Sequence, residues 1–265
     1  MSIEFLLVLC LLGGVVGTLA GLLGIGGGLI VVPALTFLLP LIGTSPEYVM
    51  PMALGTSLAT IIVTSASSAA NHLKLGNVDL FAIKWLMPGV VLGGFFGAYL
   101  VELIASDYLP KIFSLIVFML AVQMFVSSRS LASYSMPSKP TTLTVGSVIG
   151  VVSSLAGIGG GSMSVPFLSR HGVEMRHAVG SSSVCGCMIA IAGMLGFVLN
   201  GIGVEDLPQY SVGYVYLPAL IAISLVSVFT TRIGAVMATS MPTGQLKRVF
   251  AVFLLFVAGI MLFKS

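Results

Sequence analysis

The stretch AGLLGIGGGLIVVP, residues 20–33, interrupts the first long apolar run of the chain with five glycines. Glycine weakens a helix, and the proline at its end removes a backbone donor, so we expect the helix to break here and not to continue past Pro33. The stretch GIGGGSMSVP, residues 157–166, repeats this arrangement. The sequence therefore predicts two helix breaks of the same kind, and the rest of the fold depends on them.

The composition is typical of a chain that lies mostly in lipid. Of the 265 residues, 57% are apolar and only 7% are charged, whereas soluble domains carry about 25% charged residues. A membrane span needs about 20 apolar residues, and the apolar runs cover residues 3–42, 50–70, 80–101, 110–128, 141–169, 178–200, 212–238 and 246–263. We therefore expect an all-α polytopic membrane protein in a lipid bilayer, without a sizeable soluble domain. The net charge of +3 is too small to indicate nucleic-acid binding.

Neither the N-terminus nor the cysteines indicate processing or cofactor chemistry. The first apolar run has no basic residue before it and continues into the glycine break, so we interpret it as a mature membrane segment and not as a signal peptide. Cys10, Cys185 and Cys187 lie in apolar segments and are expected to be free thiols. The spacing of Cys185 and Cys187 is not that of a zinc site, and we expect no metal and no other cofactor.

The glycine break is part of a larger internal duplication. Several motifs recur in the same order: residues 24–33 with 157–166, 53–57 (ALGTS) with 178–182 (AVGSS), and 97–98 with 234–235. The offset between partners changes only across loops, which favours a true duplication over chance. The polar, proline-containing stretch between the halves suits a linker. The predicted division is a first membrane repeat over 1–128, a linker over 129–140 and a second membrane repeat over 141–265.

The length of the first apolar segment indicates how each half is threaded. Forty residues of straight helix would run about 60 Å, twice the hydrocarbon thickness. We therefore expect residues 3–22 to enter the membrane and residues 29–42 to return to the same side, and residues 141–169 to do likewise. Each half then holds a Gly-broken helical hairpin plus three transmembrane helices. An odd number of crossings remains, so the second repeat is inverted relative to the first.

The distribution of lysine and arginine supports this threading, because cytoplasmic loops are enriched in these residues. One side receives nine of them: Lys74, Lys84, Arg129, Lys139, Arg170, Arg176, Arg232, Lys247 and Arg248. The other side receives Lys111 and Lys264, together with most of the acidic residues. If each glycine segment crossed once, the division would be five against six, without a bias. We therefore predict that both termini lie outside.

The two breaks are the candidate substrate site. Non-helical chain at membrane depth survives only inside protein or beside water, and inverted-repeat transporters bind substrates at such discontinuous helices. The arms that begin after Gly28 and Gly161 carry free N–H groups and a partial positive dipole, which suits a small anion. Close helix packing through small residues is the alternative. A dinucleotide fingerprint is rejected, because Leu29 and Ser162 occupy its third glycine position and no strand–helix unit surrounds it.

Hydroxyls and one cation extend this candidate site. Thr56 and Ser57 correspond to Ser181 and Ser182, and such hydroxyls either donate to an anion or hold helices together. Arg232 lies inside the seventh segment and either binds the anion or extends to the interface. The pairs His72 with Lys74 and Arg176 with His177, at predicted helix ends, are either interfacial anchors or an anion-gathering vestibule. The small polar run TSASSAANH, residues 64–72, is expected to pack.

Motifs throughout the chain resemble the sulfite exporter (TauE/SafE) family, also called the toluene-sulfonate uptake permease family. They are GIGGGLIVVP, ALGTSLATI, NHLKLGNVD, MPGVVLGGFFGAYL, GIGGGSMSVPFL, AVGSSS, YLPALIAI and RIGAVMA. The resemblance implies a bacterial-type plasma membrane carrier for small sulfur-containing anions. The resemblance implies substrate-binding residues at the glycine motifs and their hydroxyls, and Arg232 joins them because of its place inside the seventh segment. The candidate substrate-binding residues are Gly24, Gly26, Gly27, Gly28, Thr56, Ser57, Gly157, Gly159, Gly160, Gly161, Ser181, Ser182 and Arg232. The family pattern more often has Thr at the position of Ser181, which keeps the hydroxyl but alters the size of the pocket.

The function expected from these observations is a secondary membrane transporter, with export as the expected direction. Sulfite, sulfonates or sulfoacetate would bind at the midplane between the two Gly-rich breaks. An anion channel or an uptake permease on the same scaffold is the alternative. An intramembrane hydrolase using Ser181 and His177 is disfavoured, because no orienting acid and no recognised nucleophile turn accompany them, and no enzyme is expected. The sequence leaves the exact substrate, coupling ion and oligomeric state open.

Overall fold

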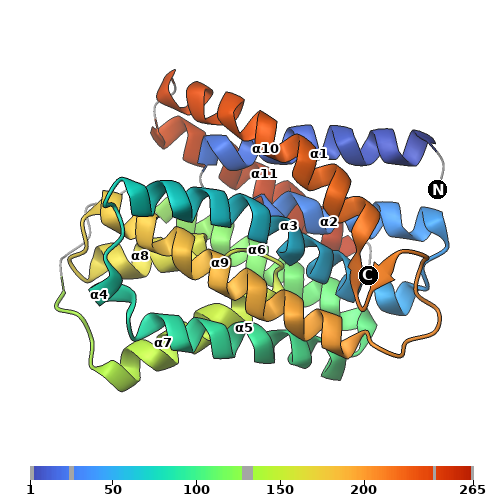
Figure 1. Ribbon diagram of the computed structural model, residues 1–265, viewed down its shortest axis with the longest axis horizontal. Coiled ribbons are helices and arrows are strands. Elements are labelled where there is room, and N and C mark those ends of the chain that lie inside the picture. Colours follow the sequence, from blue (N-terminus) through green and yellow to red (C-terminus); the bar gives the residue numbers. More distant parts are fainter. Residues whose placement is uncertain (1–2, 24–26, 127–133, 241–242, 264–265) are drawn as a thin grey trace.

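The computed structural model describes residues 3–23, 27–126, 134–240 and 243–263, and these residues are almost entirely helical (Figure 1). The α-helices are α1 (Ile3–Leu23), α2 (Gly28–Leu38), α3 (Pro46–Lys74), α4 (Leu80–Ile83), α5 (Leu86–Leu103), α6 (Leu109–Val126), α7 (Lys139–Leu155), α8 (Gly161–Arg170), α9 (Met175–Asn200), α10 (Leu217–Ser240) and α11 (Thr243–Phe263). Two 3-10 helices, η1 (Leu39–Ile42) and η2 (Ser106–Tyr108), and two strands, β1 (Ser211–Val212) and β2 (Val215–Tyr216), connect them. Within these ranges, six helices are long and apolar enough to cross a membrane. The predicted class, an all-α polytopic membrane protein, is confirmed.

Both glycine stretches divide a long apolar segment into two helices. The first segment gives α1 and α2, and the second gives α7 and α8. Gly27 and Gly160, immediately before α2 and α8, have φ angles of 66° and 67°, a left-handed conformation that glycine adopts without steric cost. Helices of 11 and 10 residues extend only about 15 Å, roughly half the hydrocarbon thickness. Helix α8 is therefore about half as long as the hydrocarbon is thick, whereas α2 continues as η1 to Ile42.

The prolines of the two glycine motifs do not end the helices, contrary to expectation. Pro33 lies inside α2 and Pro166 lies inside α8. Each is the sixth residue of its helix, and its ring fixes φ near the helical value. The helix loses one hydrogen bond close to its beginning and continues.

Two further apolar segments are also divided. Residues 80–101 form the short helix α4, capped by the Asp79 carboxylate that accepts from Ala82 N at 2.9 Å, and then α5. Pro88 lies in the first turn of α5, where a missing N–H costs no helical bond. The segment over 212–238 begins as the antiparallel pair β1 and β2, with Gly213 at a φ of 54° in the turn, before α10 starts.

The helices pack in pairs that the duplication relates to one another. Helix α1 lies against α10, and α5 lies against α7. A Cβ added at Gly13 would lie 2.8 Å from the carbonyl oxygen of Ile223, and one added at Gly146 would lie 2.6 Å from that of Leu86. Gly146 follows Gly13 by 133 residues and Ile223 follows Leu86 by 137, which are the offsets of the sequence motifs. These equivalent contacts support the duplication, whose boundaries at 1–128, 129–140 and 141–265 stay predictions.

Helices α3 and α9 pack on each other and form the centre of the molecule (Figure 1). In the spanning window of α3, 72% of the residues are buried, against 33% in that of α1. The end of α3, the end of α8 and the beginning of α9 lie at one end of the long axis, while the beginning of α1 and the end of α11 lie at the other (Figure 1). The central position of α3 brings its polar residues to both glycine breaks.

Candidate functional site

The two glycine breaks meet beside the middle of α3. Gly28 lies directly against the carbonyl oxygen of Gly157, so closely that a Cβ at Gly28 would collide with it. The hydroxyl of Ser57 donates to the carbonyl oxygen of Gly157 at 2.8 Å and lies 3.5 Å from that of Gly28. Ile61, one turn further along α3, is fully buried against Gly28 and also approaches Gly159. These residues form a packed contact, which we call the break contact, with no room for a solute.

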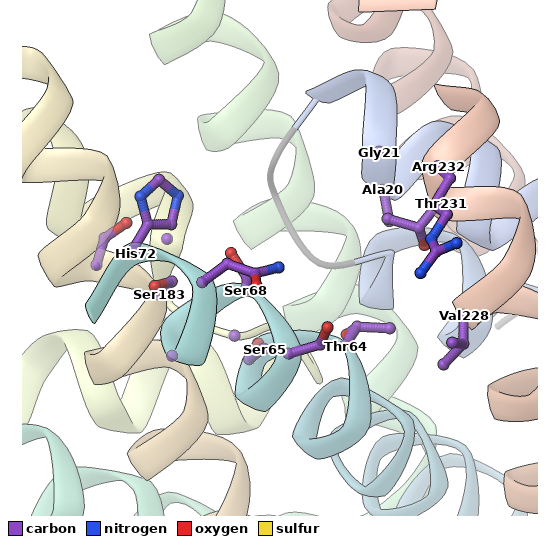
Figure 2. A pocket seen from close by; sticks show the side chains of 16 residues that line it. Ala20, Gly21, Thr64, Ser65, Ser68, His72, Ser183, Val228, Thr231 and Arg232 are labelled. Carbon is purple, nitrogen blue, oxygen red and sulfur yellow. The ribbon is translucent and has the colours of Figure 1, made fainter. Parts of the chain in front are cut away.

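A cavity of about 470 Å³ lies next to the break contact (Figure 2). The second half of α3, the beginning of α8, the first half of α9, the end of α1 and the middle of α10 form its walls. The wall on α3 is polar and includes Thr64, Ser65, Ser68 and His72. Its volume is within the range of small-molecule sites, about 300–1,000 Å³.

The beginning of α8 forms part of the cavity wall. Gly161, the first residue of α8, lines the wall. The carbonyl oxygen of Gly160 already accepts from the N–H groups of Met163 and Ser164 at 3.1 and 2.9 Å, whereas the first N–H groups of a helix have no partner inside it. The helix dipole makes this end partly positive, so the wall favours a negative solute.

The charged side chains of the cavity point to the same preference. Arg232 of α10 and His72 of α3 line it, and no Asp or Glu is among the lining residues that the structure describes. Figure 2 shows the two side chains on opposite sides of the cavity, with Thr64, Ser65 and Ser68 between them. The Nδ1 atom of His72 is buried and has no hydrogen-bond partner among the described residues.

Of the candidate substrate-binding residues, four line the cavity: Gly159, Gly161, Ser182 and Arg232. Gly24 and Gly26 lie outside the described residues. Gly28, Ser57 and Gly157 form the break contact, and Gly27 and Gly160 precede the two short helices. The structure thus gathers the two glycine motifs, but it places Thr56 and Ser181 elsewhere. A role for each of these residues in binding stays a prediction.

Thr56 and Ser181 each hold a connecting segment of the opposite half. Thr56 Oγ1 accepts from the backbone N–H of Tyr216 at 2.9 Å, and Ser181 Oγ accepts from that of Asp79 at 2.9 Å. Ser181 follows Thr56 by 125 residues and Tyr216 follows Asp79 by 137, so the two bonds are equivalent under the duplication. We call them the Thr56 latch (Thr56 with Tyr216) and the Ser181 latch (Ser181 with Asp79).

Sequence reasoning missed the polar face of α3. The run over 64–72 was expected to pack, yet Thr64, Ser65, Ser68 and His72 line the cavity. Their spacing of three to four residues puts them on one face of a helix. This spacing is visible in the sequence and could have indicated a polar helix face. Only the tertiary structure shows that this face meets an open space.

The described residues give no support to a hydrolytic pair. Ser181 Oγ is engaged by Asp79 N, and His177 Nδ1 lies 3.5 Å from a carboxylate oxygen of Glu174. No hydrogen bond between Ser181 and His177 is found in the described part of the chain. Within the same ranges, no group of three His, Cys, Asp or Glu side chains could hold a metal ion.

Comparison with known families agrees with this architecture. The sequence profile of the sulfite exporter TauE/SafE family matches residues 9–261. The chain belongs to the TauE/SafE family. Among its curated relatives, a probable membrane transporter protein of Haemophilus influenzae is 41% identical over 98% of this chain and 99% of its own length. A probable membrane transporter protein of Methanocaldococcus jannaschii is 30% identical over 88% of both chains.

No solved structure matches this TauE/SafE chain significantly. Membership of the family, together with the six apolar spans, makes the protein a multi-pass membrane transporter embedded in the bilayer.

Proposed function

We propose that this TauE/SafE protein is a secondary carrier that exports small sulfur-containing anions, such as sulfite, sulfonates or sulfoacetate. The observation that carries the proposal is the cavity beside the break contact. Its wall combines the first turn of α8, several hydroxyls and Arg232, without a carboxylate among the described lining residues. The family description names sulfite, and the chemistry of this wall fits an oxyanion.

Hydrogen bonding is the main means of recognition in this proposal. Ser182, Ser183 and Gly161 line the cavity. The two serine hydroxyls donate within α9, to the carbonyl oxygens of Val179 and Gly180 at 2.9 and 2.7 Å, and turn to the anion when it binds. Hydroxyl and backbone donors to a charged group contribute about 1.5–3 kcal/mol each. They carry no full charge of their own, so a site built mainly from them releases its anion when the walls separate.

The break contact acts as the closed barrier. It lies between the cavity and the other end of the molecule, and its residues are packed without a gap. For the anion to cross, Gly28 and Gly157 must separate while the opposite path closes, which is the alternating access of inverted-repeat carriers. With both termini outside a bacterial-type plasma membrane, as the lysine and arginine pattern predicts, the cavity faces the cytoplasm and is poised for export.

Counterflow in proteoliposomes tests the proposal. Purified protein, reconstituted with unlabelled sulfite or ethanesulfonate inside, should accumulate the labelled anion transiently from outside. Replacing Arg232 by Gln should slow this exchange at least tenfold. The substitution removes the guanidinium charge, and no other Lys or Arg is among the described lining residues. Arg176→Gln, which changes an exposed arginine outside the cavity, is the matched control and should leave exchange unchanged.

Three outcomes would contradict the proposal. Flux without stimulation by internal substrate would indicate a channel. Accumulation driven only inward by an imposed gradient would indicate an uptake permease. Equal rates for wild type and Arg232→Gln would show that this cavity is not the site.

A further inference from the structure

We infer that the anion is enclosed at only one of two duplicated helix interfaces. Helices α1 and α10 move together onto α3 and close the cavity, which brings Thr231 to Ser67 around the anion, while α5 and α7 stay fixed on α9. We call this one-sided closure. It rests on the proposed function for the anion, but the difference between the two interfaces has its own evidence.

The duplication makes the α5–α9 interface the counterpart of the α10–α3 interface. Helix α10 corresponds to α5 and helix α3 to α9, with the offsets of 137 and 125 residues found for the sequence motifs. Thr231 on α10 is thus the partner of Gly94 on α5, and Ser67 on α3 is the partner of Ala192 on α9. If both halves had the same conformation, the cavity between α3 and α10 would have a twin between α9 and α5.

The α5–α9 interface is sealed where that twin would lie. A Cβ added at Gly94 would lie 3.5 Å from the Cβ of Ala192 and 3.2 Å from the carbonyl oxygen of Ile189. Nearer the end of α9, the side-chain amide of Asn200 donates to the carbonyl oxygen of Ala98 at 3.1 Å. The two helices are therefore in direct contact, whereas Ser67 and Thr231 both line the cavity.

The residue types of the two interfaces differ in the same sense. Ile189 and Ala192 of α9 are 0% and 6% exposed. Their partners on α3 are Thr64 and Ser67, which line the cavity, and Ser67 is exposed. Burial of apolar side chains favours a permanent contact, whereas a hydroxyl buried without a partner carries a cost. The α5–α9 interface thus suits lasting contact, and the α3–α10 interface suits one that opens to water and closes on an anion.

Helices α1 and α10 form a tight pair. A Cβ added at Gly13 would lie 2.8 Å from the carbonyl oxygen of Ile223, and one added at Gly17 would lie 2.6 Å from the Cα of Ser227. In the spanning windows of both helices only 33% of the residues are buried, against 72% in that of α3. A pair with close internal contact and little burial elsewhere is expected to move as one body.

The beginning of α10 provides the pivot. Ile223 is fully buried there, and the Thr56 latch ties β2, which leads into α10, to α3. Further along the helix, Thr231 and Arg232 lie across the cavity from Ser68 of α3 (Figure 2). Rotation about the buried beginning would bring the middle of α10 onto α3 and close the cavity around its contents.

Disulfides at two equivalent positions test one-sided closure in the full-length protein. In a background without the three native cysteines, one variant carries Ser67→Cys with Thr231→Cys. The matched control carries Gly94→Cys with Ala192→Cys, where the Cβ–Cβ distance of 3.5 Å suits a disulfide. Both are oxidised with copper phenanthroline in proteoliposomes, and counterflow of labelled ethanesulfonate is measured before oxidation, after it and after reduction.

The two pairs should respond differently. The control disulfide should form and change counterflow by less than twofold, because α5 and α9 stay in contact throughout. The disulfide between positions 67 and 231 should form at least threefold faster with ethanesulfonate present and should slow counterflow at least tenfold until it is reduced. Loss of counterflow in the oxidised control would overturn the inference. So would a pair at 67 and 231 that stays reduced while the control is oxidised, or one whose disulfide leaves counterflow intact.

Hydrogen–deuterium exchange on the wild type gives a second measurement that needs no variant. Binding of ethanesulfonate should slow exchange at least threefold in residues 64–72 of α3 and 228–234 of α10. Residues 89–98 of α5 and 186–197 of α9 should exchange at the same rate with and without the anion. Equal protection of both interfaces would show that both close, contrary to the inference.

One-sided closure and the proposed function fail in different ways. If sulfite and ethanesulfonate are exchanged but the control disulfide stops counterflow, the carrier stands and one-sided closure is wrong. If neither is exchanged, while phosphate or succinate speeds the disulfide between positions 67 and 231, one-sided closure stands and the sulfur-anion assignment is wrong. If none of these anions is exchanged or speeds that disulfide, both are wrong.

Discussion

At the scale of single residues, equivalent positions in the two halves have acquired different surroundings. Ser57 and Ser182 are partners in the duplication. Ser57 is fully buried and bonds to the carbonyl oxygen of Gly157 at 2.8 Å, across the break contact. Ser182 bonds within its own helix, to the carbonyl oxygen of Val179 at 2.9 Å, and lines the cavity. The same residue type therefore lies in the break contact in one half and lines the cavity in the other.

Because of this difference, we expect serine-to-alanine substitutions at the two positions to have different effects. Ser57→Ala leaves the buried carbonyl oxygen of Gly157 without this donor, so the free energy of unfolding should fall by about 1–3 kcal/mol. Ser182→Ala removes only a bond within a helix turn, so stability should change by less than about 1 kcal/mol while anion exchange slows. Thermal unfolding in detergent and counterflow rates, measured on both variants, check the pair. Equal losses of stability would show that the two serines have the same structural role.

Tyr214, in the hairpin outside the spanning helices, predicts a dependence of stability on pH. Burial, followed by the charges of Glu102, Tyr48 and Glu47, raises the pKa of Tyr214 from 10.0 to about 12. The folded state thus keeps the proton longer than the unfolded chain, so its full stability is present below pH 10 and is lost as the pH rises towards 12. The loss amounts to about 2–3 kcal/mol. Melting temperatures between pH 9 and 12 should therefore fall less steeply for Tyr214→Phe than for wild type, and parallel curves would contradict this.

At the scale of elements, the two latches tie each half to the other. Thr56 on α3 holds the strand β2 that leads into α10, and Ser181 on α9 holds the segment that leads into α4. Neighbouring glycines permit the approach, since a Cβ at Gly55 would lie 3.0 Å from the carbonyl oxygen of Tyr214 and one at Gly180 would collide with that of Asn77. The segments that the latches hold, the strand β2 and the chain before α4, lie towards opposite ends of the long axis (Figure 1).

Each latch should loosen independently. Thr56→Val removes the acceptor for Tyr216 N and should speed hydrogen exchange in residues 211–216, with residues 77–83 unchanged. Ser181→Ala should produce the reverse pattern, because only Asp79 N loses its acceptor. Hydrogen–deuterium exchange followed by mass spectrometry reads both segments in one experiment. Faster exchange at both segments in either variant would mean that the latches are parts of one unit.

At the scale of the whole molecule, the two broken hairpins fix the threading. The turn before α3 and the turn before α9 lie at opposite ends of the long axis (Figure 1). The lysine and arginine pattern predicts that the first turn lies outside and the second in the cytoplasm. This arrangement requires the returning arms α2 and α8 to enter from opposite faces.

Cysteine labelling tests the threading. In a background without Cys10, Cys185 and Cys187, Ser45→Cys should react with an impermeant maleimide on intact cells. Met175→Cys, at the beginning of α9, should react only after permeabilisation. Reaction of both from the same face would contradict the inverted arrangement and the proposed carrier mechanism.

The apolar runs, the paired glycine motifs and their offsets were enough to predict an all-α membrane protein with two broken hairpins. These features are encoded locally. An apolar run is unfavourable in water, and the positive φ angles of Gly27 and Gly160 disfavour any residue with a side chain. The division of 80–101 and the hairpin at 211–216 were missed, because apolar composition alone does not separate a helix from a short buried strand.

The location of the cavity was decided by the tertiary structure alone. The sequence identified Gly159, Gly161, Ser182 and Arg232, but it gave the same weight to Thr56 and Ser181, which hold connecting segments. It also treated the face of α3 that carries Ser65 and Ser68 as packing, and it left His72 as either an interfacial anchor or part of a vestibule. A hydroxyl has the same chemistry in a latch, in a barrier or beside a solute, and only the packing of distant helices determines which of these surroundings it meets.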